Sequence, residues 1–254
     1  MILVKWLRTL KKKKKKKFNW QNIRLVLMLI VVIFLYSFTQ NRSQNKKISK
    51  IQVEFQGNNK MFLTNEMVNN LLIQNLGGTS SIQKDKVDLK DLESALKKQP
   101  FIENAEVFTS EDGVLITKVL QKSPVARVVN GNRNFYVDKK GSIFQLSNNF
   151  SSRVPIVQGN IEREFKKGFI ETFSAIEKDD FLKKNIIAIK IQKNGSMTML
   201  SREYDYEINF GKPVSIDKKF KNYKAFCQYA SKDSLIGKYK SINLIFTQQV
   251  VCSK

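Results

Sequence analysis

An apolar segment near the amino terminus sets the strongest limit on how this chain can fold. Residues 23–38, IRLVLMLIVVIFLYSF, are apolar except for Arg24 and Ser37. As a helix rising about 1.5 Å per residue this segment is roughly 24 Å long, and extending it back to Trp20 makes it long enough to cross the ~30 Å hydrocarbon layer. Trp20 and Tyr36 suit the two headgroup belts, and Arg24 can extend toward water. The sequence therefore predicts a transmembrane helix over 23–38.

The basic residues predict the orientation of this helix. Nine of the 45 Lys and Arg lie in residues 1–22, which contain no acid, and seven of them form the run Lys11–Lys17. Because basic flanks stay cytoplasmic, residues 1–22 are expected to be a cytoplasmic tail and the rest to lie on the far side. A lysine run can also bind nucleic acid. Directly before a membrane helix it is better explained as a topology determinant that also pairs with anionic lipid.

The segment after the apolar run bears on whether the anchor is cleaved. Residues 39–47, TQNRSQNKK, contain no small-x-small cleavage pattern, which favours an uncleaved signal anchor over a signal peptide. The segment is polar and predicts a linker. The first ten residues fit either a short interfacial helix or a simple tail.

Residues 48–122 predict an α+β domain with the order strand, helix, helix, strand, strand. ISKIQVEFQGNNK alternates apolar and polar residues as a half-buried strand does. TNEMVNNLL and DLKDLESALKKQP have helical apolar spacing behind the N-caps Thr64 and Asp88. FIENAEVFTS and VLITKVLQ are strands separated by Glu111-Asp112-Gly113, and Asp-Gly is a strong hairpin signal.

Residues 123–254 predict a β-rich domain with flanking helices. Pro124 cannot donate to a strand ladder, so it marks the seam where the first sheet ends and a second begins. A hairpin with a turn over 138–141, a helical region, three short strands and an amphipathic helix over 216–231 follow.

The closing segment SINLIFTQQVVCSK predicts a final strand at an exposed sheet edge. Its alternation places one set of side chains toward the core, namely Ile242, Leu244 and Phe246, and the other set away from it, namely Ser241, Asn243 and Ile245. An apolar Ile245 on an otherwise polar face is a small sign of a covered surface, although scattered exposed hydrophobic residues are common.

The composition offers little support for catalysis. The chain has no histidine, which removes the usual general base and the commonest metal ligand. Glu203, Asp205 and Glu207 would share one strand face, but a solvated acidic face explains them without a catalytic role. We expect no enzyme, no cofactor and no metal site. Cys227 and Cys252 fit a disulfide and two unpaired buried thiols equally well.

In this order, the segments resemble a POTRA domain, the polypeptide-transport-associated module, and more specifically the FtsQ/DivIB family of bacterial cell-division proteins. The resemblance rests on VEFQGNNKMFLTNEMV, VDLKDLESALKKQPFIENAEVFTSEDGVLITKVLQKSPVARV, the YVDKKGSIF hairpin and VPIVQGN, and it covers most of residues 20–254. Gln121-Lys122-Ser123 stands where a charged pair often precedes the proline, a mild departure from the family.

The resemblance implies a single-pass scaffold of the bacterial inner membrane at the division septum. Its C-terminal domain would bind FtsB/FtsL-type bitopic coiled-coil partners in the periplasm, other divisome components would contact the POTRA domain, and the complex would help control septal peptidoglycan synthesis. In the family the last strand and last helix form the partner surface. These elements correspond here to Ser241, Ile242, Asn243, Leu244, Ile245, Phe246 and Thr247, with Tyr223 on the helix. A POTRA factor for polypeptide transport is the alternative; a single POTRA copy and a helical anchor argue against it.

Overall fold

The computed structural model describes most of the 254-residue chain. The described residues are 20–44, 47–57, 62–77, 83–131, 133–159, 161, 166–232 and 236–254. Residues 1–19 of the predicted tail and residues 162–165 of the helical region predicted over 162–184 lie outside them.

The anchor is the long helix α2 (Trp20–Gln44), with an apolar window over Ile23–Gln40 whose side chains are all exposed. The helix runs beyond Phe38, so most of the segment 39–47 predicted as a linker is helical. The Thr39 hydroxyl donates to the Leu35 carbonyl at 2.7 Å, which satisfies this polar group within the helix.

The domain after the anchor has the predicted order of elements. A three-stranded sheet has β3 in the centre, parallel to β1 and antiparallel to β2. The helices pack on it and begin at the predicted caps: Thr64 accepts from the Met67 amide, and Asp88 accepts from the amides of Lys90 and Asp91. The elements are β1 (Lys50–Gln56), α3 (Asn65–Asn75), the 3-10 helix η1 (Lys84–Lys86), α4 (Leu89–Lys97), β2 (Ile102–Thr109) and β3 (Val114–Gln121).

The second domain is a nine-stranded sheet with the order β12-β11-β10-β9-β8-β7-β4-β5-β6. Two residues separate β3 from β4, which begins at Pro124. The elements are β4 (Pro124–Asn130), β5 (Arg133–Asp138), β6 (Ile143–Gln145), β7 (Ile156–Gln158), α5 (Lys166–Lys178), α6 (Asp180–Asn185), β8 (Ile186–Ile191), β9 (Met197–Ser201), β10 (Glu207–Gly211), α7 (Ile216–Lys232), the 3-10 helix η2 (Ile236–Lys238), β11 (Ser241–Asn243) and β12 (Val251–Ser253).

One face of this sheet carries the core, and helices α5, α6 and α7 cover that face. Strand register aligns a buried row across six strands: Val128, Val157, Ile189, Met199, Ile208 and Ile242. These residues share one hydrophobic cluster with Phe169 of α5, Leu182 of α6 and Phe220 of α7. The period-2 alternation of the strands and the helical spacing of the helices thus meet in one layer of apolar side chains.

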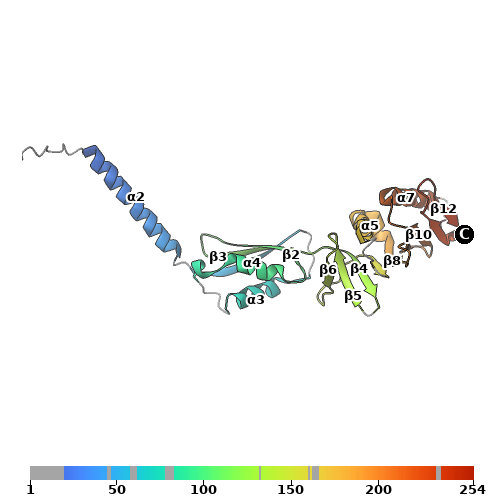
Figure 1. The fold of residues 1–254 in the computed structure, drawn as a ribbon, viewed down its shortest axis with the longest axis horizontal. Coiled ribbons are helices and arrows are strands. Elements are labelled where there is room, and N and C mark those ends of the chain that lie inside the picture. Colours follow the sequence, from blue (N-terminus) through green and yellow to red (C-terminus); the bar gives the residue numbers. More distant parts are fainter. Residues whose placement is uncertain are drawn as a thin grey trace, which may run out of the picture.

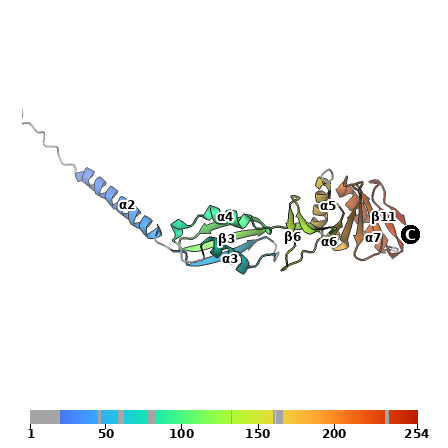
Figure 2. The same cartoon turned by 60° about the horizontal axis from the view of Figure 1, so that its bottom comes forward.

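The molecule is elongated, with the anchor at one end and β12 at the other. Figures 1 and 2 both show the first domain between α2 and the nine-stranded sheet, with β6 next to the first domain and the C-terminus at the far end. The strands of the large sheet therefore succeed one another away from the first domain.

Candidate partner-binding edge

The closing segment forms two short strands, so the predicted single edge strand over Ser241–Thr247 is wrong. β11 ends at Asn243 because the side-chain Oδ1 of Asn243 accepts from the Ile245 amide at 2.9 Å, a local turn that competes with continued strand. Ile242 and Leu244 are buried as predicted, whereas Phe246, expected in the core, is 53% exposed because the alternation stops before it.

β11 is not the edge of the sheet. It pairs in parallel with β10 and antiparallel with β12, so both of its sides are occupied. Ser241 and Asn243 are half-buried, and their partners in β12 are Ser253 and Val251. A proline at Asn243 would therefore disturb pairing inside the sheet instead of probing a free edge.

The free edge is β12. The Leu244 amide donates to the Asn209 carbonyl of β10 at 2.9 Å. The backbone groups of Ile242 therefore face β10, and those of Ser241 and Asn243 face β12. Antiparallel pairs alternate between bonded and non-bonded positions, and Ile242 opposite Cys252 is then the non-bonded pair. This alternation places the Cys252 N–H and C=O on the outer side of β12, where the described part of the chain adds no further strand.

Apolar side chains lie exposed around this edge. Ile245 and Phe246 follow β11, Val251 belongs to β12, and Tyr229 on α7 is 70% exposed. α7 is tied to this region because the Asn222 side-chain amide donates to the Thr247 carbonyl at 3.1 Å. The Ile245 side chain also packs closely against Gly211, whose φ is +72°. A Cβ added to Gly211 would lie 2.9 Å from the Cγ1 of Ile245. Ile245, Phe246, Val251 and the outer side of β12 are called the β12 edge below.

Tyr223, predicted on the partner surface, lies in the core instead. Its hydroxyl donates to the Asn185 side-chain oxygen at 2.5 Å and lies 2.9 Å from the Tyr206 hydroxyl. Burial raises the pKa of both tyrosines above their ordinary value. This polar network joins α7 to the end of α6 and to the loop before β10, so Tyr223 positions the helix and is too deeply buried to touch a partner.

Both cysteines are free thiols in the structure. Cys227 is buried, with its sulfur 3.8 Å from the Tyr206 hydroxyl, and Cys252 is half-buried on β12. Burial raises the pKa of both thiols, which makes them poor nucleophiles. Neither is therefore a candidate for nucleophilic catalysis.

The buried Lys219 fastens the start of α7 to the sheet. Its Nζ donates to the Phe210 and Lys212 carbonyls at 2.7 and 2.9 Å and lies 4.7 Å from the centre of the Phe210 ring. Burial lowers the pKa of Lys219, and the two carbonyls satisfy its ammonium group. The strand β10 and the helix beside the edge are thus rigidly connected.

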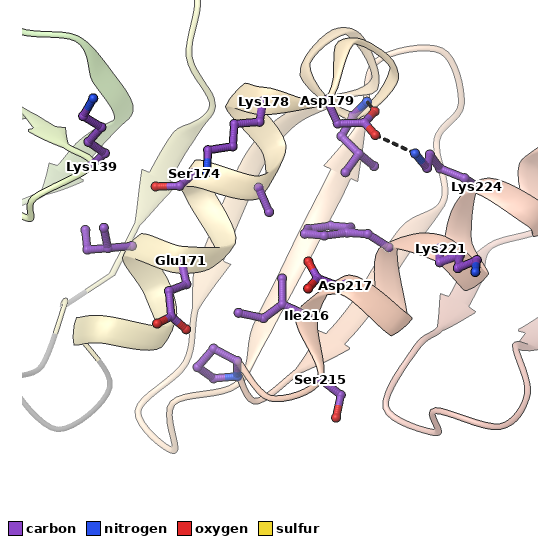
Figure 3. A pocket seen from close by; sticks show the side chains of 15 residues that line it. Lys139, Glu171, Ser174, Lys178, Asp179, Ser215, Ile216, Asp217, Lys221 and Lys224 are labelled. Carbon is purple, nitrogen blue, oxygen red and sulfur yellow. Dashed lines mark hydrogen bonds and ion pairs between the residues drawn. The ribbon is translucent and has the colours of Figure 1, made fainter.

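A groove of about 990 Å³ runs between α5 and α7 (Figure 3). Its floor is apolar, including Ile216 and Phe220, and its rim carries both lysines and acids. Lys224 and Asp179 form an ion pair at 2.5 Å across it. Asp179 also caps α6, and the hydrogen bond from Lys224 lowers the pKa of Asp179.

The acidic residues considered as catalytic candidates lie at the surface of the described chain. Glu203, Asp205 and Glu207 are all exposed, and of the three only Glu207 lies in a strand. Among these residues no group of three or more His, Cys, Asp or Glu side chains could hold a metal ion. What the geometry offers is a strand edge with apolar surroundings, which is a binding feature.

The edge could be anticipated only in part from the sequence. The Val250-Val251-Cys252 run has the β-branched character of a strand, but the predicted final strand covers only Ser241–Thr247 and does not include this run. Exposed Tyr229 has no distinguishing sequence signal on an amphipathic helix.

An anchored chain with a small mixed α+β module and a one-sided β domain defines a class of protein, the single-pass membrane scaffold. Residues 46–120 match the family model for a POTRA-like domain, and residues 123–253 match the model described as FtsQ/DivIB, C-terminal related. The second match alone covers more than half of the chain. The chain belongs to the FtsQ/DivIB family.

The FtsQ/DivIB family is a family of non-catalytic division scaffolds, so membership supports a cell-division scaffold role for this chain and implies protein–protein interactions within the divisome. The apolar helix and the family together describe a single-pass protein of the inner membrane. No curated protein matches the chain.

Proposed function

We propose that the chain binds FtsB/FtsL-type bitopic partners by adding one of their strands to the β12 edge, and that this complex helps control septal peptidoglycan synthesis. The observation that carries the proposal is the unpaired outer side of β12, at the end of the sheet farthest from the membrane anchor. The resemblance to the family, in which the last strand and last helix bind partners, supports the same elements here.

Strand addition is a known mode of peptide recognition with a clear division of labour. Backbone hydrogen bonds to the exposed edge supply affinity, and pockets or apolar side chains beside the edge supply selectivity. At the β12 edge the backbone groups are those of Cys252, and the flanking apolar side chains are Ile245, Phe246 and Val251. Ser241 to Thr247 then contribute through β11 and the exposed turn after it.

The nine basic residues before the anchor support a cytoplasmic N-terminus. In this topology the POTRA domain and the β domain lie in the periplasm, at the septum, where partner segments of bitopic division proteins are found. The POTRA domain would contact further divisome components.

A proline scan of β12 tests the proposal. Cys252→Pro removes the one outward N–H of β12 and leaves the inward amides of Val251 and Ser253 to pair with β11. Cys252→Ala is the matched control, because it removes the same thiol and keeps the N–H. Tagged full-length variants are captured from mildly cross-linked membranes, and the proteins that accompany them are identified.

We expect small bitopic coiled-coil division proteins with the wild type and with Cys252→Ala, and at least tenfold less of them with Cys252→Pro. Undiminished capture by a folded Cys252→Pro protein, as judged by circular dichroism, rules out strand addition at β12. Recovery of outer-membrane precursors in place of division proteins would favour a role in polypeptide transport.

A further inference from the structure

The POTRA domain and the β domain share one aromatic core. Phe62 of the POTRA domain is fully buried, and its ring centre lies 5.6 Å from that of Phe101 in the same domain. It also lies 5.8 Å from Tyr136, 6.2 Å from Phe144 and 5.2 Å from Phe150, all of the β domain. Tyr136 and Phe144 therefore belong to the hydrophobic cluster of the POTRA domain and are excluded from that of their own sheet.

Polar contacts close the same junction from the outside. Lys140 of the β5–β6 turn forms an ion pair with Glu103 of β2 at 2.7 Å, and the Ser147 hydroxyl donates to the Phe62 carbonyl at 3.4 Å. Only Lys122 and Ser123 separate β3 from β4, and the Lys122 amide donates to the Phe101 carbonyl at 2.8 Å. Such a junction has no free hinge, so the two domains form one body.

The opposite end of the POTRA domain lies close to the membrane. The Ser49 amide donates to the Gly113 carbonyl at 2.9 Å, and Lys47 forms a bridge with Gln83, so the chain joins the folded domain at Lys47. The apolar window of α2 ends at Gln40. Between Gln40 and the folded domain lie the four helical residues 41–44 and the three residues 45–47, which together span at most about 16 Å. This distance is little more than the thickness of the headgroup layer plus one Debye length.

The length of the body follows from its strands. β3 has eight residues and leads from the membrane-proximal end of the POTRA domain to the junction, about 25 Å away. Nine strands spaced by about 4.8 Å then extend from β6 at the junction to β12, a further distance of roughly 38 Å. Sheet twist shortens the total only modestly, which leaves the β12 edge roughly 60 Å from the base of the POTRA domain.

We infer that the fused domains act as a rigid spacer that stands upright on the anchor and holds the β12 edge roughly 60 Å above the membrane, and that the edge therefore fits a partner segment carried at this height. The partner of matching geometry is a membrane-anchored chain whose docking strand follows a helical stalk of about 40 residues, since a helix rises about 1.5 Å per residue. This choice of partner rests on the proposed function, whereas the height itself does not.

A cross-linking series measures the height without any partner. Full-length protein carrying Cys252→Ser and Ser253→Cys is reconstituted into liposomes with a bitopic probe. The probe has one transmembrane helix and a stalk of 20, 40 or 60 residues of EAAAK repeats that ends in a cysteine, a semi-rigid spacer of known rise. Disulfide yield under mild oxidation reports which stalk reaches β12, and the buried Cys227 does not compete.

We expect the 40-residue stalk to give a yield at least fivefold higher than the 20-residue stalk and higher than the 60-residue stalk. Equal yields from the 20- and 40-residue stalks would mean that the edge approaches the membrane, and would overturn the inference. Because no partner binding is involved, a failure of strand addition at β12 leaves this result unchanged, so the two hypotheses fail separately.

A loosened variant tests whether the aromatic junction causes the rigidity. It carries eight Gly and Ser residues between Lys122 and Ser123 together with Phe144→Ala, which removes one ring of the shared core. The control carries the same insertion between Asn194 and Gly195, in the turn between β8 and β9. The loosened variant should cross-link all three stalks within about twofold of one another, and the control should keep the preference for 40 residues; a loosened variant that also keeps it would overturn the role of the junction.

Discussion

The two ends of the nine-stranded sheet differ in how far the rest of the molecule covers their apolar side chains. At the β6 end, Phe144 is almost fully buried against the POTRA domain, and Tyr136 lies beside it. At the β12 end, Ile245, Phe246 and Val251 are each more than 40% exposed. Sheet edges attract other strands and are normally protected. The proposal of partner binding at the β12 edge rests on this contrast between an end that is covered within the chain and an end that is apolar and open.

The largest expected effect is a difference in stability between matched phenylalanines at the two ends. Phe62→Ala removes the ring at the centre of the closed junction and should lower the free energy of unfolding by about 3–5 kcal/mol. Phe246→Ala, at the open end, should change it by less than about 0.5 kcal/mol. Guanidinium denaturation of the two full-length variants in detergent measures both. Similar decreases in the free energy of unfolding for the two variants would show that the two ends of the sheet do not differ in this way.

A smaller effect is expected from the tyrosine network beneath the open end. Tyr223→Phe keeps the ring, removes the donor to the Asn185 side-chain oxygen and removes one of the partners of the Tyr206 hydroxyl, so unfolding should become easier by about 1–3 kcal/mol. Because Tyr223 is buried, the variant should capture less partner only if the substitution displaces α7. An unaltered stability together with lost capture would instead show that Tyr223 contacts the partner.

The same network predicts loss of stability at high pH. Burial raises the folded-state pKa values of Tyr206, Tyr223 and Cys227 above their unfolded values, so the neutral forms are favoured in the folded protein. The resulting stability is present below the unfolded pKa values, near 9 for Cys and 10 for Tyr, and declines as the pH rises beyond them. Denaturation midpoints from pH 7 to 11 should therefore fall at the alkaline end, with a weaker dependence in Tyr223→Phe.

The smallest effect should come from the cap that joins the helices over the sheet. Asp179→Ala removes the N-cap of α6 and the ion pair with Lys224, at a cost of about 1 kcal/mol. Because the pKa of Asp179 is lowered in the folded state, its contribution should be present above the unfolded value near 3.9 and decline as the pH falls below it. A pH-independent difference between wild type and Asp179→Ala would exclude the ion pair as the cause.

Features governed by neighbours in the sequence could be predicted from the sequence. The caps at Thr64 and Asp88 and the hairpin turn ending in Gly141 depend on side chains within a few residues of the groups they bond. The order of elements followed from the same local signals. These interactions require no contact with distant parts of the chain, so the local sequence is enough to predict them.

The partner surface depended on contacts that the sequence pattern does not reveal. Alternation in Ile242, Leu244 and Phe246 predicts one continuous strand, and a single hydrogen bond from the Ile245 amide to the Asn243 side chain ends it. Tyr223 has the spacing of a core residue, yet its hydroxyl partners, Asn185 and Tyr206, lie in other elements. The burial of Tyr136 and Phe144 against the POTRA domain likewise depends on Phe62, which lies more than 70 positions earlier in the chain.

The shared aromatic core also has a consequence for biosynthesis. A chain is made from its N-terminus, so Phe62 and Phe101 emerge before Tyr136, Phe144 and Phe150, which cover them in the finished protein. Until those residues follow, the POTRA domain has an uncovered aromatic end of the kind that invites aggregation. We therefore expect a nascent chain arrested shortly after Gln121 to remain sensitive to protease, and one extended past Phe150 to become resistant.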